Sequence, residues 1–315
     1  MASMTLLCRN ATTFSRSGEL DEDAFRQSLQ RFVDAKLGVY LASGGSGEGH
    51  SLTWDELRRV YRIGVEVCKG KVQVNSNFPE QHTAVASLAH AQLAAEAGVD
   101  VVNIYGPAGW HGFRPTDTEY LTYFDRILAE VKHPVALCPN PVLGYSVKPS
   151  VIANICEKYS QVVAINLSGI SGDRYFINLK DVLTRDVDIY VAYPGSLHTL
   201  DMGATGLLGA EANFIPRTFR RYIDLYEARK FEELSQVYAS ITRVSQFVEQ
   251  WKASTPRWIK LAMRAFKLPG GEGGVREPYL MLEDAEVQRF MIGALRLDVP
   301  EINEMAQAAG LPLPD

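Results

Sequence analysis

Residues 71–105 read KVQVNSNFPEQHTAVASLAHAQLAAEAGVDVVNIY and contain one complete strand–helix–strand unit. The segment 71–75 alternates charged or polar with apolar residues, and Asp100–Tyr105 forms a second, β-branched run; both patterns are typical of strands. Between them, Thr83–Ala97 is rich in helix-forming alanine, and Gly98 suits the left-handed position that ends a helix. Two strands joined by a helix predict parallel neighbours in a sheet.

The same alternation repeats through the first two thirds of the chain. We expect eight strands, at Met4–Cys8, Leu37–Ala42, Lys71–Asn75, Asp100–Tyr105, Pro134–Cys138, Val162–Asn166, Asp188–Ala192 and Gly206–Gly209. A further helix is expected after the second of these strands, at Thr53–Cys68, where Thr53 and Glu56 form a capping-box pattern. Eight such units within about 210 residues favour a closed (β/α)8 TIM barrel over an open sheet.

The strand pattern stops shortly after residue 210. Four helical segments follow, at Arg217–Arg229, Phe231–Trp251, Pro256–Phe266 and Glu283–Arg296. We therefore predict an α/β chain with a barrel over residues 1–215 and a C-terminal helical extension over residues 216–315, both within one structural unit. In such barrels the chemistry lies at the C-terminal ends of the strands and in the loops that follow them.

Composition excludes several classes of partner. A net charge of -5 and a pI near 5.8 argue against general binding to nucleic acid or to an anionic membrane. The most alanine-rich stretch, residues 84–102, contains His90, Glu96 and Asp100 and is too polar to span a membrane. The four cysteines are widely spaced and form no CxxC pair, which favours reduced thiols and a cytoplasmic location.

The N-terminus allows two interpretations. Residues 1–18 contain Arg9 and Arg16 and no acidic residue, a composition that a transit peptide shares. The alternative is a first strand at Met4–Cys8 followed by a polar loop. Because helical amphipathicity is weak in this segment, we favour the strand.

A glycine-rich loop follows the second expected strand. It runs Ser43-Gly-Gly-Ser-Gly-Glu-Gly49 and precedes a helix, so its N–H groups can surround a phosphate or a carboxylate. No GK[ST] follows it, and His50 stands where a dinucleotide-binding loop would have its third glycine. A tight turn without a ligand is the alternative interpretation.

Other candidate residues are less specific. The six histidines show no metal-ligand spacing, so we predict neither a metal nor another cofactor. Cys138 ends the fifth expected strand and is either a nucleophile or a buried, inert thiol. Tyr105 and Tyr145 fall in loops at the predicted mouth, where they line a pocket or only contribute packing.

Several motifs, taken in order, resemble those of one family, the dihydrodipicolinate synthase / N-acetylneuraminate lyase family of pyruvate-dependent class I aldolases. The motifs are Thr12-Thr-Phe14 with Gly18, Ser43-Gly-Gly-Ser-Gly-Glu48 with Leu52, Glu56 and Arg59, Asn140-Pro141 with Gly144, Glu211-Ala-Asn213 with Pro216, Trp258-Ile-Lys260, and Gly274-Val-Arg276 with Pro278. They span nearly the whole chain. The resemblance implies a TIM barrel and a small 2-keto acid or carboxylate as ligand.

The residues that perform the family's chemistry are changed. The resemblance places Asn166 at the lysine that forms a Schiff base with pyruvate, and an amide nitrogen is not nucleophilic. Cys138 takes the place of the proton-relaying tyrosine, and Gly45 and Ser46 take the places of two threonines. We therefore predict that Schiff-base chemistry is lost, with Asn166, Cys138 and Ser46 at the positions of the catalytic residues.

This chain retains two parts of the family pattern, the barrel mouth and the glycine loop. We expect the ligand to contact Gly45, Ser46, Gly47, Tyr105, Tyr145 and Asn213. Two interpretations follow: a lyase-like enzyme with altered chemistry, or a catalytically inactive paralogue that binds a small carboxylate as a sensor or structural partner. The resemblance also implies a homo-oligomer, a dimer or tetramer, in which Trp110 and Phe113 lie near the partner subunit.

Overall fold

The computed structural model describes residues 4–109, 111–170, 173–193, 197–251 and 256–312. Eight parallel strands pair in sequence order, and β1 pairs with β8, so the sheet closes into a barrel. The strands are β1 Thr5–Cys8, β2 Gly38–Leu41, β3 Val74–Asn77, β4 Val101–Tyr105, β5 Val135–Cys138, β6 Val162–Asn166, β7 Asp188–Ala192 and β8 Gly206–Gly209. The predicted (β/α)8 barrel is confirmed, as is the strand interpretation of the N-terminus.

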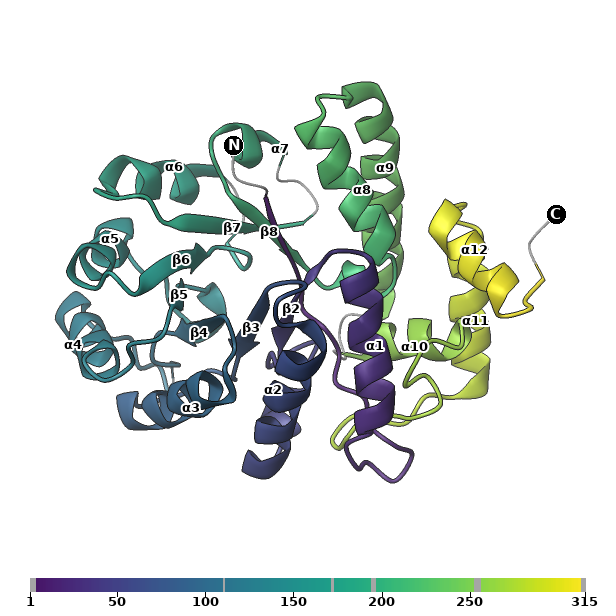
Figure 1. Cartoon of the computed structure of the whole chain (residues 1–315), viewed down its shortest axis with the longest axis horizontal. Coiled ribbons are helices and arrows are strands. Elements are labelled where there is room, and N and C mark those ends of the chain that lie inside the picture. The colour runs from purple at the N-terminus through teal and green to yellow at the C-terminus, as the bar shows by residue number, and fades with distance from the viewer. Residues whose placement is uncertain (1–3, 110, 171–172, 194–196, 252–255, 313–315) are drawn as a thin grey trace.

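A helix follows every strand and covers the outside of the barrel (Figure 1). These helices are α1 Glu22–Asp34, α2 Trp54–Cys68, α3 Ala84–Ala97, α4 Asp117–Leu128, α5 Pro149–Lys158, α6 Asp173–Val182, α7 Leu197–Asp201 and α8 Pro216–Glu227. Thr53 caps α2 with a complete capping box to Glu56, and Gly98 ends α3 with φ of 85°. Both helix boundaries were predicted from these residues.

The C-terminal extension consists of α9 Phe231–Val248, α10 Arg257–Ala265, α11 Asp284–Leu295 and α12 Pro300–Ala308. Helix α9 packs beside α8, whereas α10 to α12 gather on the side of the barrel where α1 lies (Figure 1). Helix α8 falls within the predicted extension, but it follows β8 as the other barrel helices follow their strands. The boundary at residue 215 therefore stays a prediction. Helix α12, which the sequence did not indicate, adds a last helix to the tail.

One strand is displaced from its predicted position. The pattern placed the third strand at residues 71–75, but the sheet begins at Val74. The N–H groups of Lys71 and Val72 donate to the carbonyl of Cys68, and Gly70 has φ of 80°, so these residues still belong to the turn that ends α2. Strand β3 then pairs with β4 through its polar residues Asn75, Ser76 and Asn77.

The apolar side chains form two separate layers. The larger cluster fills the space between the strands and the surrounding helices. A smaller cluster lies inside the barrel and includes Leu7, Tyr40, Ala136, Ala164 and Tyr190. Since side chains alternate along a strand, this inner cluster identifies which residues of each strand face the barrel axis.

The extension is attached to the barrel through a buried ion pair. Nζ of Lys260, on α10, lies 3.3 Å from Oε1 of Glu48, and both side chains are almost fully buried. The same ammonium donates to the carbonyl of Thr12 and lies 5.0 Å from the centre of the Phe14 ring. Burial lowers the pKa of Lys260, and the negative charge of Glu48 opposes that shift.

A second cation reinforces this attachment. The guanidinium of Arg276 forms a two-pronged pair with Glu56 on α2 and packs 4.2 Å from the Phe14 ring centre. It also donates to the carbonyls of Gly18 and Ser51. The hydrogen bonds from Arg276 lower the pKa of Glu56 to about 2, so this carboxylate stays charged through the neutral range.

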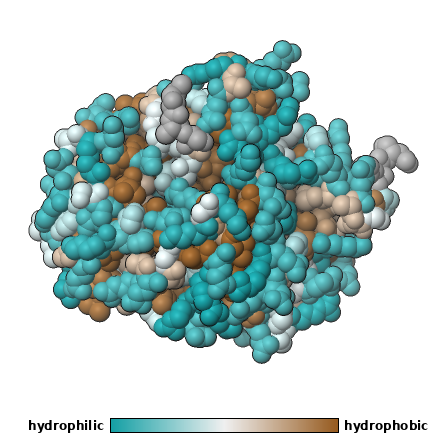
Figure 2. Space-filling model, viewed as in Figure 1, coloured by the Kyte–Doolittle hydropathy of each residue, from teal (hydrophilic) through white to brown (hydrophobic). Residues whose placement is uncertain are grey.

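The outer surface is mainly polar. Figure 2 shows hydrophilic residues over most of one face, with apolar patches in the furrows between elements. Among the helices in the described part of the chain, none combines the length and apolar character that a membrane crossing requires.

The buried pair predicts an unequal response to charge removal. Glu48→Gln leaves the Lys260 ammonium buried without its counter-charge, so the free energy of unfolding should fall by about 3–5 kcal/mol. Glu130→Gln removes one partner of the exposed pair with Arg126 and should cost less than about 1 kcal/mol. Urea denaturation of both variants measures the difference, and equal losses would contradict the role given to the buried pair.

Candidate active site at the barrel mouth

Polar side chains occupy the inner face of the barrel where the strands end. Asn77, Asn103, Tyr105, Cys138 and Asn166 lie on β3 to β6. The register makes Asn77 the neighbour of Asn103 and Tyr105 the neighbour of Cys138, while Ala136 and Ala164 of the inner cluster fix the parity of β5 and β6. Three of the sequence-predicted residues, Tyr105, Cys138 and Asn166, are therefore brought to one place.

Asn166 is held by hydrogen bonds on both sides of its carboxamide. Its Nδ2 donates to the hydroxyl of Tyr40 over 2.8 Å, and its Oδ1 accepts from the N–H of Ser168 over 2.9 Å. The side chain is 4% exposed. These partners fix which side of the amide faces Tyr40.

Tyr40 links Asn166 to Cys138. Its hydroxyl lies 3.6 Å from Sγ of Cys138, and that sulfur lies 3.9 Å from Oδ1 of Asn103. Asn103 in turn donates to the carbonyl of Ser76. The result is a continuous chain of polar contacts across the barrel, centred on a tyrosine that sequence reasoning did not single out.

The Cys138 thiol is fully buried at the end of β5. Burial raises its pKa to about 12, although hydrogen bonds with Tyr40 and Asn166 act in the opposite direction. A thiol with this pKa carries almost no thiolate at neutral pH. Of the two interpretations that the sequence left open for Cys138, the structure favours the buried, inert thiol.

Two charged groups act on Tyr105 from the mouth. Burial raises the pKa of Tyr105, and the Glu80 carboxylate adds to this shift, whereas the Arg9 guanidinium opposes it. The Tyr105 hydroxyl donates to Oδ1 of Asn77 over 3.5 Å. Neither Arg9 nor Glu80 was among the predicted site residues.

The Glu80 carboxylate lies beside the glycine loop. It follows β3, is half-buried, and has Oε2 3.4 Å from the point where a Cβ on Gly44 would lie. Burial raises the pKa of this carboxyl. A carboxyl with a raised pKa is a stronger proton acceptor than an ordinary carboxylate. The signal available in the sequence was an acid in the loop after a barrel strand.

The glycine loop uses much of its backbone on itself. The N–H of Gly47 donates to Oγ of Ser43, that of Glu48 to the carbonyl of Gly45, and that of Gly49 to the carbonyl of Ser43. A side chain at Gly47 would come within 2.7 Å of the Ser43 nitrogen, so the turn itself demands glycine. Ser46 is buried and Gly45 exposed. Ligand contact by Gly45, Ser46 and Gly47 stays a prediction.

Tyr145 and Asn213 both hold loops in place. The Tyr145 hydroxyl donates to the carbonyl of Pro107 over 2.6 Å. The Asn213 carboxamide donates to the carbonyls of Arg9 and Ala210 and accepts from the N–H of Ala11, so it joins the loop after β1 to the loop after β8. Their contact with a ligand stays a prediction.

No described lysine contacts the Asn166, Tyr40 and Cys138 group. Lys148, the nearest in sequence to the loop after β5, is exposed and pairs with Asp117 over 2.6 Å. Lys252 lies outside the described residues, as does Trp110. Within the described residues, no three His, Cys, Asp or Glu side chains are placed to bind a metal ion.

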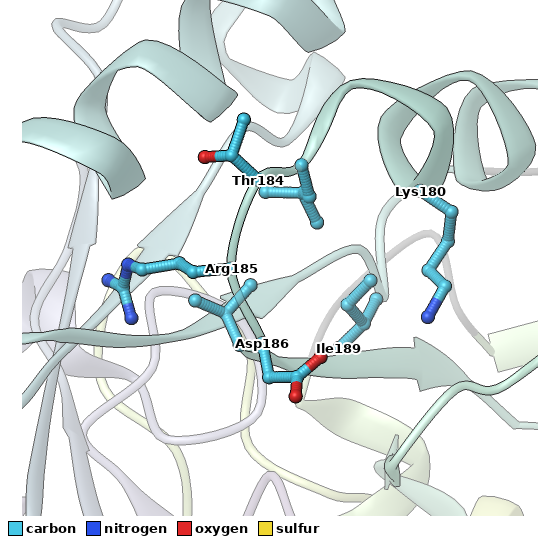
Figure 3. Close-up of a pocket in the computed structure, with 7 residues that line it drawn as sticks. Lys180, Thr184, Arg185, Asp186 and Ile189 are labelled. Carbon is cyan, nitrogen blue, oxygen red and sulfur yellow. The ribbon is translucent and has the colours of Figure 1, made fainter.

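A small hollow of about 220 Å³ is lined by residues between Lys180 and Ile189 (Figure 3). These residues precede or begin β7, whereas the mouth lies where the strands end. Arg185, at its edge, extends away from Lys180. Its guanidinium donates to the carbonyls of Cys156, Tyr159 and Val162, and so fixes the turn between α5 and β6. The arginine is therefore structural, and we place the candidate site at the mouth.

Comparison with known proteins identifies relatives along most of the chain. The sequence pattern of the dihydrodipicolinate synthetase family matches residues 3–293. A 4-hydroxy-tetrahydrodipicolinate synthase of Methanococcus aeolicus is 24% identical over 277 residues, which cover 85% of this chain and 90% of that protein. An enzyme of the same name from Methanococcus maripaludis is 27% identical over 265 residues, or 82% and 86% of the two chains.

Solved structures share the fold. The 4-hydroxy-tetrahydrodipicolinate synthase of Methylacidiphilum fumariolicum superposes with a TM-score of 0.82 at 19% identity, and 98% of each chain is covered. A prophage protein of the dihydrodipicolinic acid synthase family from E. coli K12, solved in complex with pyruvate, gives 0.82 at 18% identity, with 94% of this chain and 99% of that chain covered. At these identities the likeness shows the fold.

The burial of Cys138 predicts an unreactive native protein. All four cysteines are buried and unpaired, and burial raises the pKa of Cys68 to about 12 and of Cys156 to about 11. At pH 8 we expect little reaction with a thiol reagent such as DTNB until the protein is unfolded in guanidinium. Rapid labelling of one native cysteine, abolished by Cys138→Ser, would show that Cys138 is an exposed and reactive thiol.

Proposed function

Because the chain belongs to the dihydrodipicolinate synthetase family, we propose that it binds a small 2-keto acid at the barrel mouth and acts on it as a lyase-like protein without a Schiff base. The observation that carries the proposal is Asn166. It stands at the end of β6, where the resemblance implies the Schiff-base lysine, and its amide is fixed between Tyr40 and Ser168.

The chemistry available at Asn166 is hydrogen bonding. An amide nitrogen shares its lone pair with the carbonyl and does not attack a ketone. An N–H of this amide, in place of its contact with Cys138, can donate to a substrate carbonyl oxygen and stabilise negative charge that develops there. The site therefore supports polarisation of the carbonyl and does not support an iminium.

In this proposal, Glu80 is the group that transfers the proton. The Glu80 carboxylate takes a proton from the carbon beside the keto group, the C–H electron pair forms the enolate C=C bond, and the carbonyl oxygen receives the charge. Return of the proton reverses the step without any net oxidation. General acid–base catalysis typically contributes ~10²–10⁴-fold, enough for an easy isomerisation or hydration.

A second function is favoured by the same amide. Asn166, Tyr40 and Cys138 form a closed polar chain that resembles a structural element as much as a catalytic one. We therefore retain the alternative of a catalytically inactive paralogue that binds a small carboxylate as a sensor or as the structural partner of an active subunit. Binding without proton transfer distinguishes it.

The proposal extends to assembly and location. We infer a homo-oligomer, dimer or tetramer, on family resemblance, and Phe113 is consistent with a contact surface because its side chain is 45% exposed. We also propose a cytoplasmic location, which the four unpaired cysteines support.

Borohydride trapping tests the loss of amine chemistry. Incubation with pyruvate and sodium borohydride should leave the intact mass of the protein unchanged, because no described lysine reaches the Asn166 position. Asn166→Lys places an amine there and should gain the reduced pyruvate adduct. Asn154→Lys, on the exposed side of α5, is the matched control and should gain none. An adduct on the unmodified protein would overturn the proposal.

Deuterium exchange tests the proton-transfer step. In D2O the protein should accelerate exchange of the pyruvate methyl protons, followed by NMR. Since burial raises the pKa of Glu80, the rate should increase with pH through a carboxyl pKa above its usual range and then level off. Glu80→Gln should abolish the acceleration. Glu96→Gln, at an exposed position of α3, is the control and should leave the acceleration unchanged. Pyruvate binding with no exchange at any pH would favour the inactive paralogue.

A further inference from the structure

Arg9 is directed into the barrel mouth by its position just after β1. Leu7 belongs to the inner cluster and Cys8 to the outer one, so the next side chain returns to the inside. The N–H of Arg9 donates to the carbonyl of Gly209 over 3.1 Å, and its carbonyl accepts from Asn213. Both backbone groups are therefore fixed, and the guanidinium extends from a rigid base.

The hydrogen bonding of the Arg9 guanidinium is incomplete. Among the described residues it makes no ion pair and no hydrogen bond, and its Nε is buried without an acceptor. Other half-buried arginines of this chain differ: Arg276 pairs with Glu56, and Arg31 donates to the carbonyl of Asn213. A buried N–H without an acceptor is costly, which points to a group absent from the protein itself.

A second unpartnered donor lies at the same mouth. Asn77 is fully buried at the end of β3, and its Oδ1 accepts from Tyr105, but its Nδ2 has no partner among the described residues. The charge of Arg9 reaches Tyr105 as well, because it opposes the burial that raises the Tyr105 pKa. Tyr105 thus has both unpartnered donors in its surroundings.

Two unsatisfied donors, one of them a cation, call for an anion. A guanidinium matches the two oxygens of a carboxylate, and an amide N–H adds a further donor. Glu80 places a negative charge beside the same mouth, which disfavours a second charge on the ligand. The N–H groups of Gly47, Glu48 and Gly49 are already used within their loop, so the glycine loop offers fewer donors than its sequence suggests.

We propose that Arg9, assisted by Nδ2 of Asn77, is the carboxylate anchor of this barrel and selects small monocarboxylates. The inference rests on the proposed function in one respect, since a 2-keto acid is the ligand whose carboxylate would be held. The anchor itself requires only a carboxylate, so it can be tested separately from keto-acid binding.

Calorimetric titration provides the test, with pyruvate, acetate and the uncharged analogue pyruvamide as probes. We expect Arg9→Gln to weaken pyruvate and acetate binding at least tenfold, Arg9→Lys to weaken it less, and pyruvamide binding to stay equal in all variants. Arg126→Gln, an exposed arginine of α4, is the control and should bind like the unaltered protein. Unchanged pyruvate affinity in Arg9→Gln would overturn the anchor.

The outcomes separate the two proposals. Acetate binding that depends on Arg9, without any binding of 2-keto acids, supports the anchor and removes the proposed function. Pyruvate binding that does not depend on Arg9 overturns the anchor and leaves the proposed function in place. Absence of binding by any carboxylate overturns both proposals.

A measurement on the unaltered protein covers the case in which Arg9→Gln does not fold. Phenylglyoxal modifies accessible arginines, and peptide mass spectrometry reports each site. Acetate should protect Arg9 and leave Arg126 unprotected, whereas equal modification of Arg9 with and without acetate would count against the anchor.

Discussion

The buried pair between Lys260 and Glu48 is the constraint on which the rest of the structure depends. Glu48 closes the glycine loop at the mouth, and Lys260 belongs to the helical extension, so one interaction determines the position of both. Burial of two charges is favourable only when each satisfies the other and further polar groups surround them. The carbonyl of Thr12 accepts from Lys260, and the N–H of Arg276 donates to Glu48. The Phe14 ring packs beside the ammonium, so the loop after β1 belongs to the same arrangement.

This arrangement explains how protein groups alone hold the mouth together. The loops after β1, β2 and β8 are joined to one another by Asn213, Glu48 and Lys260 rather than by a ligand. Asn166 and Cys138, which lie inside the barrel, take no part in these loop-to-loop contacts. The residues that join the loops are therefore distinct from those of the candidate site.

Most of the fold could be predicted from the sequence because it depends on local signals. Alternating strand and helix patterns gave the barrel, and Thr53 and Gly98 marked helix ends correctly. The start of the third strand could not be predicted, since the turn bonds after α2 occupy Lys71 and Val72. Sequence periodicity does not show at which residue such a turn ends and the strand begins.

The site was predicted less completely, for a geometric reason. Asn166, Cys138 and Tyr105 were found because they end strands or match family positions. Tyr40 lies within a strand, where only the closed register shows that it faces inward. Arg9 was interpreted as part of a basic N-terminal segment, and its role depends on having no partner in three dimensions. Unsatisfied hydrogen bonding is a property that a sequence does not display.

The two partners of each of these ion pairs lie far apart along the chain, and this has a consequence for biosynthesis. Arg276 lies 220 residues beyond Glu56, and Lys260 is similarly far from Glu48. When the ribosome has released all eight strands, these carboxylates still lack their cations. The nascent barrel must therefore keep its first loops hydrated until the last part of the chain emerges, and a prematurely terminated product would expose those loops to proteolysis.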